Sequence, residues 1–193
     1  METMDVRLLT LPQVRDVYRQ HIIRDFPADE CKPLFAIERA MERGEYLCFG
    51  AFREDTLLAY AFFVALDGDY LFDYLAVCQG LRGQGIGSRF LQTLMRGPLR
   101  EAACVLLEID DPDHAEDAEE RALRLRRERF YLRNGLTHTG VTAYVFHVHY
   151  KILELPICPP HARQEVGDIY RRLYHAIMPE WTYRKMVEVD AED

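Results

Sequence analysis

The sequence predicts an α/β fold built on a mixed, mostly antiparallel sheet with helices on both faces. Apolar runs at residues 46–52, 57–66 and 71–78 are separated by short turns, so these strands run antiparallel. A glycine-rich turn at residues 80–87 then leads directly into an amphipathic helix. The next strand, residues 103–109, is reached through that helix and should run parallel to the strand at residues 71–78.

The segments before these strands read as one strand and two helices. Residues 6–9 predict a short strand, and a helix follows from Leu11, with Pro12 suited to its first turn. A second helix is expected over residues 34–41 and ends at Gly44.

After the central strands we expect a helix over residues 117–134 and then one long strand over residues 143–155. The helix is dense in arginine, with an apolar stripe that consists of Ala118, Ala122, Leu125 and Leu132, with Leu123 and Phe130 beside it. Three prolines follow residue 155, and a further helix is expected over residues 162–177. The domain organisation is therefore a main domain over residues 1–155 and a helical extension over residues 156–193 that packs on it. We expect the extension to cover the core, with a substrate lid or a dimer contact as the alternatives.

Composition limits the class of protein. The chain has 193 residues and a net charge of −8, which argues against nucleic-acid binding and is compatible with a cationic substrate. No apolar stretch is long enough to cross a membrane, and the first residues show no secretory signal. Five cysteines stand at positions 31, 48, 78, 104 and 158 without any C-x-x-C pair, which indicates reduced thiols in a cytoplasmic protein. A monomer or a homodimer is expected.

The glycine-rich turn predicts an anion site. The first N–H groups of a helix have no partners within the helix, and glycines let a ligand approach them closely. No Gly-Lys-Ser/Thr follows, so the spacing excludes a Walker A loop. The dinucleotide fingerprint G-x-G-x-x-G fits at Gly83 and Gly85 but meets Ser88 at its third glycine. A nicotinamide-dependent oxidoreductase therefore remains an alternative.

The pattern R-x-x-G-x-G at Arg82, Gly85 and Gly87 fits without exception. It resembles the acetyl-coenzyme A loop of the GCN5-related N-acetyltransferases. Phe130-Tyr131-x-x-x-Gly135 resembles the second signature of that family, and the resemblance covers about residues 5 to 155. The chain departs from the family pattern at three positions, which are Gln79, Arg124 and Leu136.

The resemblance implies that acetyl-coenzyme A is the acyl donor and that the sheet splits between its two central parallel strands. Backbone groups of Leu75, Ala76 and Val77 would hold the acetyl carbonyl and the pantetheine arm. The N–H groups of the turn would take the pyrophosphate, with the charge of Arg82 beside it. The implied pyrophosphate loop consists of Gly83, Gln84, Gly85, Ile86, Gly87 and Ser88.

Tyr131 is the candidate general acid, because a phenol is protonated at neutral pH and can donate to the departing thiolate. Asp73, inside an apolar strand, and Glu108, near the end of the next strand, are both candidate general bases, and a water chain is a third route. His147 and His149 share one face of the expected last strand, but no third ligand is evident, so no metal is expected.

These patterns predict an N-acetyltransferase that moves an acetyl group from acetyl-coenzyme A to an amine of a small molecule or peptide by direct transfer. Two alternatives stay open: an acyl-coenzyme A binding module without catalysis, and the oxidoreductase. The acidic loop at residues 110–113 gives a weak indication of a cationic acceptor.

Overall fold

The structure is a computed structural model that describes residues 4–28, 30–157 and 159–191. The chain forms two compact units, each with its own strands and helices. The first holds Met1–Ala65 and Phe72–Arg100, and the second holds Leu66–Leu71 and Glu101–Asp193. None of Cys31, Cys48, Cys78 and Cys104 is in a disulfide. The fifth cysteine, Cys158, lies outside the described residues.

The first unit is built on β1 (Asp5–Leu8), β2 (Tyr46–Arg53), β3 (Thr56–Leu66) and most of β4 (Asp69–Val77). β1, β2 and β3 pair antiparallel in sequence order, with Tyr46 opposite Val64 and Asp5 opposite Phe52. Every residue of β3 from 58 to 65 is buried. Burial on both sides of a strand requires helices on both faces of the sheet, as the sequence predicted.

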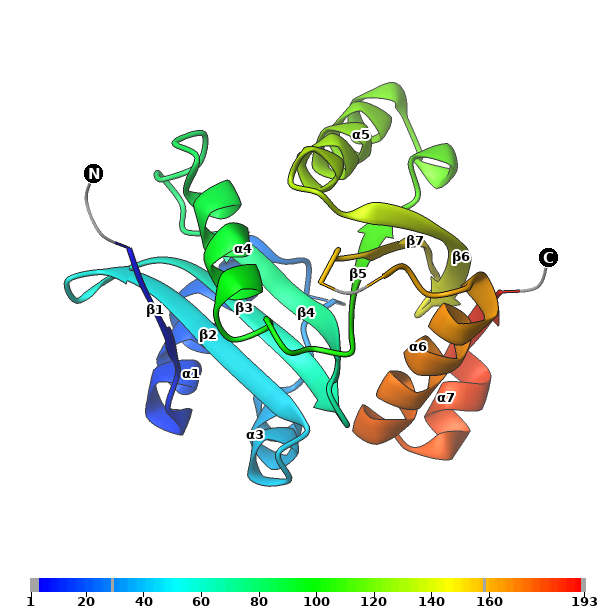
Figure 1. The fold of residues 1–193 in the computed structure, drawn as a ribbon, viewed down its shortest axis with the longest axis horizontal. Coiled ribbons are helices and arrows are strands. Elements are labelled where there is room, and N and C mark those ends of the chain that lie inside the picture. The colour runs from blue at the N-terminus through cyan, green and yellow to red at the C-terminus, as the bar shows by residue number, and fades with distance from the viewer. Residues whose placement is uncertain (1–3, 29, 158, 192–193) are drawn as a thin grey trace. The chain divides into compact units, whose positions relative to one another are not determined.

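The helices of the first unit provide this cover: α4 (Ile86–Arg96) lies on one face of the sheet, and α1 (Leu11–Val17) and α3 (Leu34–Glu42) lie on the other (Figure 1). The expected first helix is not a regular α-helix over its whole length. It continues through a π-helical turn, η1 (Tyr18–Ile22), and a last turn, α2 (Ile23–Asp25).

The second unit is built on β5 (Cys104–Asp110), β6 (Thr137–Val145), β7 (Val148–Glu154) and β8 (Val187–Asp190), in the order β5-β7-β6-β8. All three pairings within it are antiparallel. The expectation of one long strand over residues 143–155 is wrong, because Phe146 and His147 form a tight turn with positive φ angles. An apolar run does not reveal such a turn when neither central residue is glycine.

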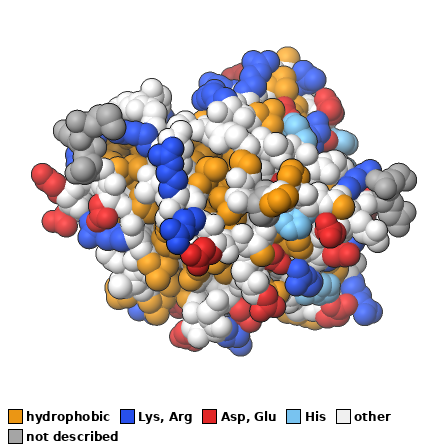
Figure 2. Space-filling view, in the orientation of Figure 1, with side chains coloured by type: hydrophobic (Ala, Val, Ile, Leu, Met, Phe, Trp, Pro, Cys, Tyr) orange, Lys and Arg blue, Asp and Glu red, His pale blue; other side chains and the backbone are white. Residues whose placement is uncertain are grey.

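A short 3₁₀ turn, η2 (Pro112–His114), leads to α5 (Ala118–Arg133). Asp117 caps this helix by accepting a hydrogen bond from the N–H of Glu120 at 2.8 Å. The expected apolar stripe is not buried: no residue of α5 is, and the Leu123 side chain is 40% exposed. Lys and Arg side chains gather over α5 at the top of Figure 2.

The C-terminal residues form α6 (Arg163–Ile177), α7 (Glu180–Met186) and β8. α6 packs against β6 and β8 with a buried face that includes Val166, Tyr170 and Leu173. β8 pairs with β6 from Thr142 to Val145, so the end of the chain adds a strand that the sequence did not predict. Trp181, in α7, is 72% exposed.

Candidate active site

The glycine-rich turn of the first unit has the backbone that an anion site requires. Gly83 and Gly85 have φ angles of +80° and +73°, which side chains other than glycine adopt only with strain. Gly85 is the N-cap of α4, and neither a capping side chain nor an acidic residue is present in the described first turn of α4. The first N–H groups of α4 are thus left for a ligand, at the positive end of the helix dipole.

Leu75, Ala76 and Val77 end β4 immediately before this turn. All three are half-buried, whereas Tyr74 before them and Cys78 after them are buried. This part of the strand therefore keeps some of its surface accessible next to the turn.

Arg82 is anchored by a carboxylate that sequence reasoning missed. Its Nη2 donates to Oδ1 of Asp25 at 3.1 Å, and its Nε donates to the carbonyl oxygen of Val77 at 3.3 Å. Asp25 also accepts from the Tyr60 hydroxyl at 3.0 Å and from the Gln79 amide at 3.4 Å. No sequence motif connects Asp25 with Arg82, because 57 residues separate them and only folding brings the end of α2 to the turn.

Asp73 is a buried and doubly partnered acid, with its side chain 7% exposed. Lys32 pairs with its Oδ1, and the Tyr46 hydroxyl donates to its Oδ2. Burial, together with the charge of Asp73, raises the pKa of Tyr46 well above its usual value, so this phenol remains a donor. Both oxygens of Asp73 are therefore engaged by the protein itself.

Glu108, the second candidate base, lies on β5 in the second unit and is half-buried. The hydroxyls of Tyr170 and Tyr174 both donate to its Oε1, the latter at 2.6 Å. Burial and the charge of Glu108 raise the pKa of Tyr170 well above its usual value. The C-terminal helix thus fixes the orientation of a candidate catalytic carboxylate. The sequence hinted at this only through two tyrosines four residues apart in α6.

Tyr131 stands in the last turns of α5, also in the second unit, with its ring edge-on to Phe130 at 5.1 Å between centroids. Tyr131 is half-buried, and its loss of solvation raises its pKa to about 12, although the nearby charge of Arg127 acts in the opposite direction. Tyr131 is therefore a protonated donor at neutral pH.

The acidic loop is neutralised by basic side chains of its own unit. Arg127 pairs with Asp110 at 2.8 Å, Arg121 with Asp113 at 3.3 Å, and Lys151 with Asp111 at 2.9 Å. The loop therefore gives little support to a preference for a cationic acceptor.

The expectation that His147 and His149 share one face of a strand is wrong. His147 lies in the β6–β7 turn with a φ angle of +71°, which ends the strand alternation that was to place it on one face with His149. His149 instead stacks on His114 with ring centroids 3.8 Å apart. Both line a hollow of about 300 Å³, together with Tyr144, Glu188 and Asp190 among others.

The structure distributes the candidate residues over the two units. Leu75–Val77, the glycine-rich turn and Asp73 belong to the first, and Glu108 and Tyr131 belong to the second. Among the described residues, no helix is long and apolar enough to cross a membrane.

Comparison with known families gives a match over most of this chain. A sequence model of the Acetyltransferase (GNAT) family matches residues 15–134, which include the glycine-rich turn, Glu108 and Tyr131. The chain belongs to the GNAT acetyltransferase family. It is an N-acetyltransferase of this family with a mixed α/β fold, and its acceptor is unidentified. A comparison with curated protein sequences gave no match.

Solved structures share the fold of this acetyltransferase. A protein assigned to the GNAT family from Bacteroides thetaiotaomicron has a TM-score of 0.68 at 19% identity, covering 88% of this chain and 96% of that one. The ribosomal-protein-S18-alanine N-acetyltransferase from Escherichia coli has a TM-score of 0.55 at 19% identity, covering 80% and 94%. A Bacillus subtilis acetyltransferase in complex with CoA has a TM-score of 0.51 at 12% identity, covering 79% and 98%.

Proposed function

We propose that this acetyltransferase moves the acetyl group directly from acetyl-coenzyme A to an amine while both substrates are bound. The observation that carries the proposal is the uncapped N-terminus of α4, which follows glycines with positive φ in a motif typical of the family. The N–H groups from Gly83 to Ser88 would bind the pyrophosphate, and those of Leu75, Ala76 and Val77 would bind the pantetheine arm and the acetyl carbonyl.

Arg82 would add its charge at the edge of this site while Asp25 fixes its position. The guanidinium remains 61% exposed despite the ion pair, so it still offers donors toward solvent. An arginine in this state can approach a phosphate without leaving its carboxylate partner.

In the chemical step, the lone pair of a neutral amine attacks the thioester carbon and the carbon–sulfur bond breaks. The amine gives up a proton to a general base, and the departing thiolate takes one from the Tyr131 hydroxyl. The base would be Glu108 or Asp73, directly or through a water; both carboxylates already accept hydrogen bonds from protein side chains. Tyr170 and Tyr174 would hold the Glu108 carboxylate in place.

The coenzyme site is tested with two matched glycine substitutions. Gly85 and Gly44 have φ angles of +73° and +75°, and an added Cβ would meet no atom within 4 Å at either position. Gly85→Asp and Gly44→Asp therefore carry similar backbone strain, but only the first places a carboxylate where phosphate would bind. Calorimetry should show that Gly85→Asp abolishes coenzyme A binding and that Gly44→Asp retains it. Tight binding of a nicotinamide dinucleotide without coenzyme A binding would instead support the oxidoreductase.

The acceptor is sought by measuring thiol release from acetyl-coenzyme A with a panel of small amines, aminoglycosides and peptides with free N-termini. Coenzyme binding without transfer to any amine would favour the non-catalytic binding module. We further propose a cytoplasmic protein, because the four described cysteines form no disulfide. We also propose that it is a monomer or a homodimer.

A further inference from the structure

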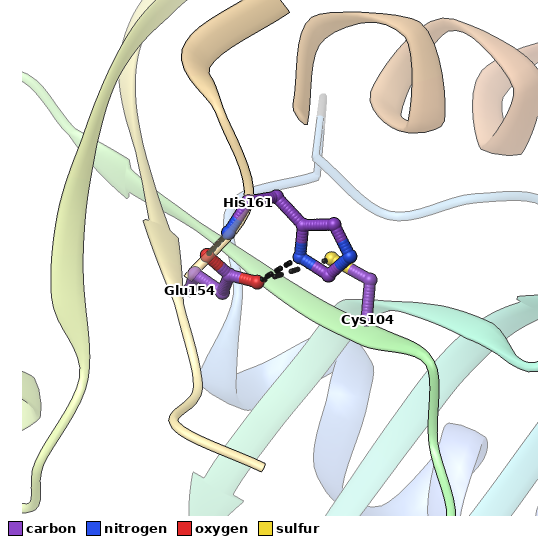
Figure 3. A group of neighbouring side chains, drawn as sticks. All are labelled: Cys104, Glu154 and His161. Carbon is purple, nitrogen blue, oxygen red and sulfur yellow. Dashed lines mark hydrogen bonds and ion pairs between the residues drawn. The ribbon is translucent and has the colours of Figure 1, made fainter. Parts of the chain in front are cut away.

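A cysteine, a glutamate and a histidine meet in the second unit, and none of the three is assigned to acetyl transfer. Cys104 opens β5, Glu154 ends β7, and His161 lies in the connection that leads to α6 (Figure 3). Their Sγ, carboxylate oxygen and ring nitrogen atoms all lie within 4.8 Å of one another.

The strand register explains why Cys104 and Glu154 share one face. Leu106 on β5 stands directly opposite Glu154 on β7. Cys104 precedes Leu106 by two residues, so strand alternation turns its side chain to the same face as that of Glu154. The Sγ of Cys104 is 3.6 Å from Oε1 of Glu154.

The carboxylate of Glu154 also fixes His161. Its Oε1 is 2.5 Å from Nδ1 of the imidazole, and its Oε2 accepts a hydrogen bond from the backbone N–H of His161 at 3.2 Å. Both the ring and the backbone of His161 are thus held against the end of β7. The imidazole lies at the rim, because its side chain is 24% exposed while that of Glu154 is 4% exposed.

We propose that Cys104, Glu154 and His161 form a zinc site with three protein ligands. Thiolate, imidazole and carboxylate are the ligand types that Zn²⁺ takes in proteins. Tetrahedral zinc with bonds of about 2.0 to 2.3 Å places its ligand atoms roughly 3.3 to 3.8 Å apart. The Sγ–Oε1 distance of 3.6 Å already meets this spacing. The Nδ1–Oε1 distance of 2.5 Å would open by about 1 Å as zinc replaces the proton between His161 and Glu154.

The charges around the cluster also favour a divalent cation. Cys104 is fully buried, and Asp69 is a second buried acid nearby, paired with Arg172 at 2.7 Å. With Cys104 as a thiolate, Asp69, Glu154 and Cys104 carry three negative charges, of which Arg172 balances that of Asp69, and Zn²⁺ would balance the other two. Burying such charges without a counter-ion is costly.

Zinc at this position would attach the connection before α6 to β5 and β7. α6 carries Tyr170 and Tyr174, which hold Glu108. The metal would therefore have a structural role and would act on catalysis only through the position of this helix.

Metal content and cobalt spectroscopy test the proposal. After treatment with a chelator and dialysis against Zn²⁺, the wild-type protein should retain one zinc per chain. Co²⁺ in its place should give the near-ultraviolet charge-transfer band of a thiolate ligand and the intense visible bands of tetrahedral cobalt. Cys104→Ala should lose the thiolate band, whereas Cys48→Ala, the same change at another fully buried strand cysteine, should retain it.

His161→Gln provides a variant that does not disturb the core, because the imidazole lies at the rim. Its zinc affinity should fall by at least about a hundredfold, the upper limit observed when only an outer-shell partner of a metal is lost. If Cys104→Ala does not fold, the zinc affinity of His161→Gln and the cobalt–thiolate band of the wild-type protein decide the question. The proposal is wrong if the wild type retains no zinc, if Co²⁺ gives no thiolate band, or if His161→Gln binds zinc as tightly as the wild type.

Discussion

The surroundings of Tyr131 change the pKa of its hydroxyl, the candidate general acid. A phenol exposed to water has a pKa of about 10, whereas partial burial at the end of α5 raises that of Tyr131 to about 12. The hydroxyl is then a weaker acid, but it stays protonated up to about pH 12. A proton is therefore available when the thiolate leaves, although its transfer from a phenol of higher pKa is less favourable than from an ordinary one.

Tyr131→Phe removes one hydroxyl and keeps the ring packed on Phe130. We expect the turnover number to fall by about a hundredfold or more, the usual contribution of a general acid, with little change in coenzyme affinity. Single-turnover kinetics with a good acceptor measure this without interference from product release. A variant that transfers acetyl groups at the parent rate would make Tyr131 a packing residue.

The raised pKa of Tyr131 also predicts a pH profile. Activity that requires the protonated phenol is lost only as pH rises through about 12. The rate of the chemical step should therefore show no alkaline decline between neutral pH and about pH 10, where a phenol of ordinary pKa would be half ionised. A decline in that interval that disappears in Tyr131→Phe would contradict the pKa assigned to this residue.

At the scale of elements, α6 and the end of the chain form one packed assembly. Gly167 in α6 leaves no room for a larger residue, because an added Cβ would lie 2.4 Å from the Cβ of Ala191. β8, just before Ala191, supplies the outer strand beside β6. The absence of a side chain at Gly167 therefore allows Ala191, and β8 before it, to pack against α6.

Gly167→Ala tests this packing. In an ordinary helix the change stabilises by up to about 1 kcal/mol, but here the overlap should destabilise the protein by about 1 to 3 kcal/mol. The double variant Gly167→Ala with Ala191→Gly removes the overlap and should recover the stability in urea unfolding. If the single variant is more stable than the parent, the end of the chain does not pack against Gly167.

At the scale of the whole molecule, coenzyme binding should stabilise the folded chain. A ligand that binds only the folded state at a hundred times its dissociation constant contributes about 2.7 kcal/mol. For a chain of this length, that corresponds to a rise in Tm of roughly 5 to 11 °C. Thermal unfolding with and without coenzyme A measures the shift. Gly85→Asp should abolish it and Gly44→Asp should not, and equal shifts in both variants would place the coenzyme elsewhere.

The sequence by itself determined the features that depend on local chemistry and short spacing. The glycine-rich turn, the strand before it and the helix after it follow from neighbouring residues, and the structure has all three. Asp117 and Gly44 mark helix ends through their own backbone preferences. These features are encoded within a few residues, so no long-range contact is needed to predict them.

Tertiary structure decided the partners of charged and polar side chains. Asp25 anchors Arg82, Tyr174 orients Glu108, and Cys104 meets Glu154 and His161, in each case across tens of residues. The β6–β7 turn and β8 also escaped prediction, because a turn without glycine and a short last strand depend on pairing with other strands. Such pairings are set by which elements pack together, and the order of residues along the chain does not specify this locally.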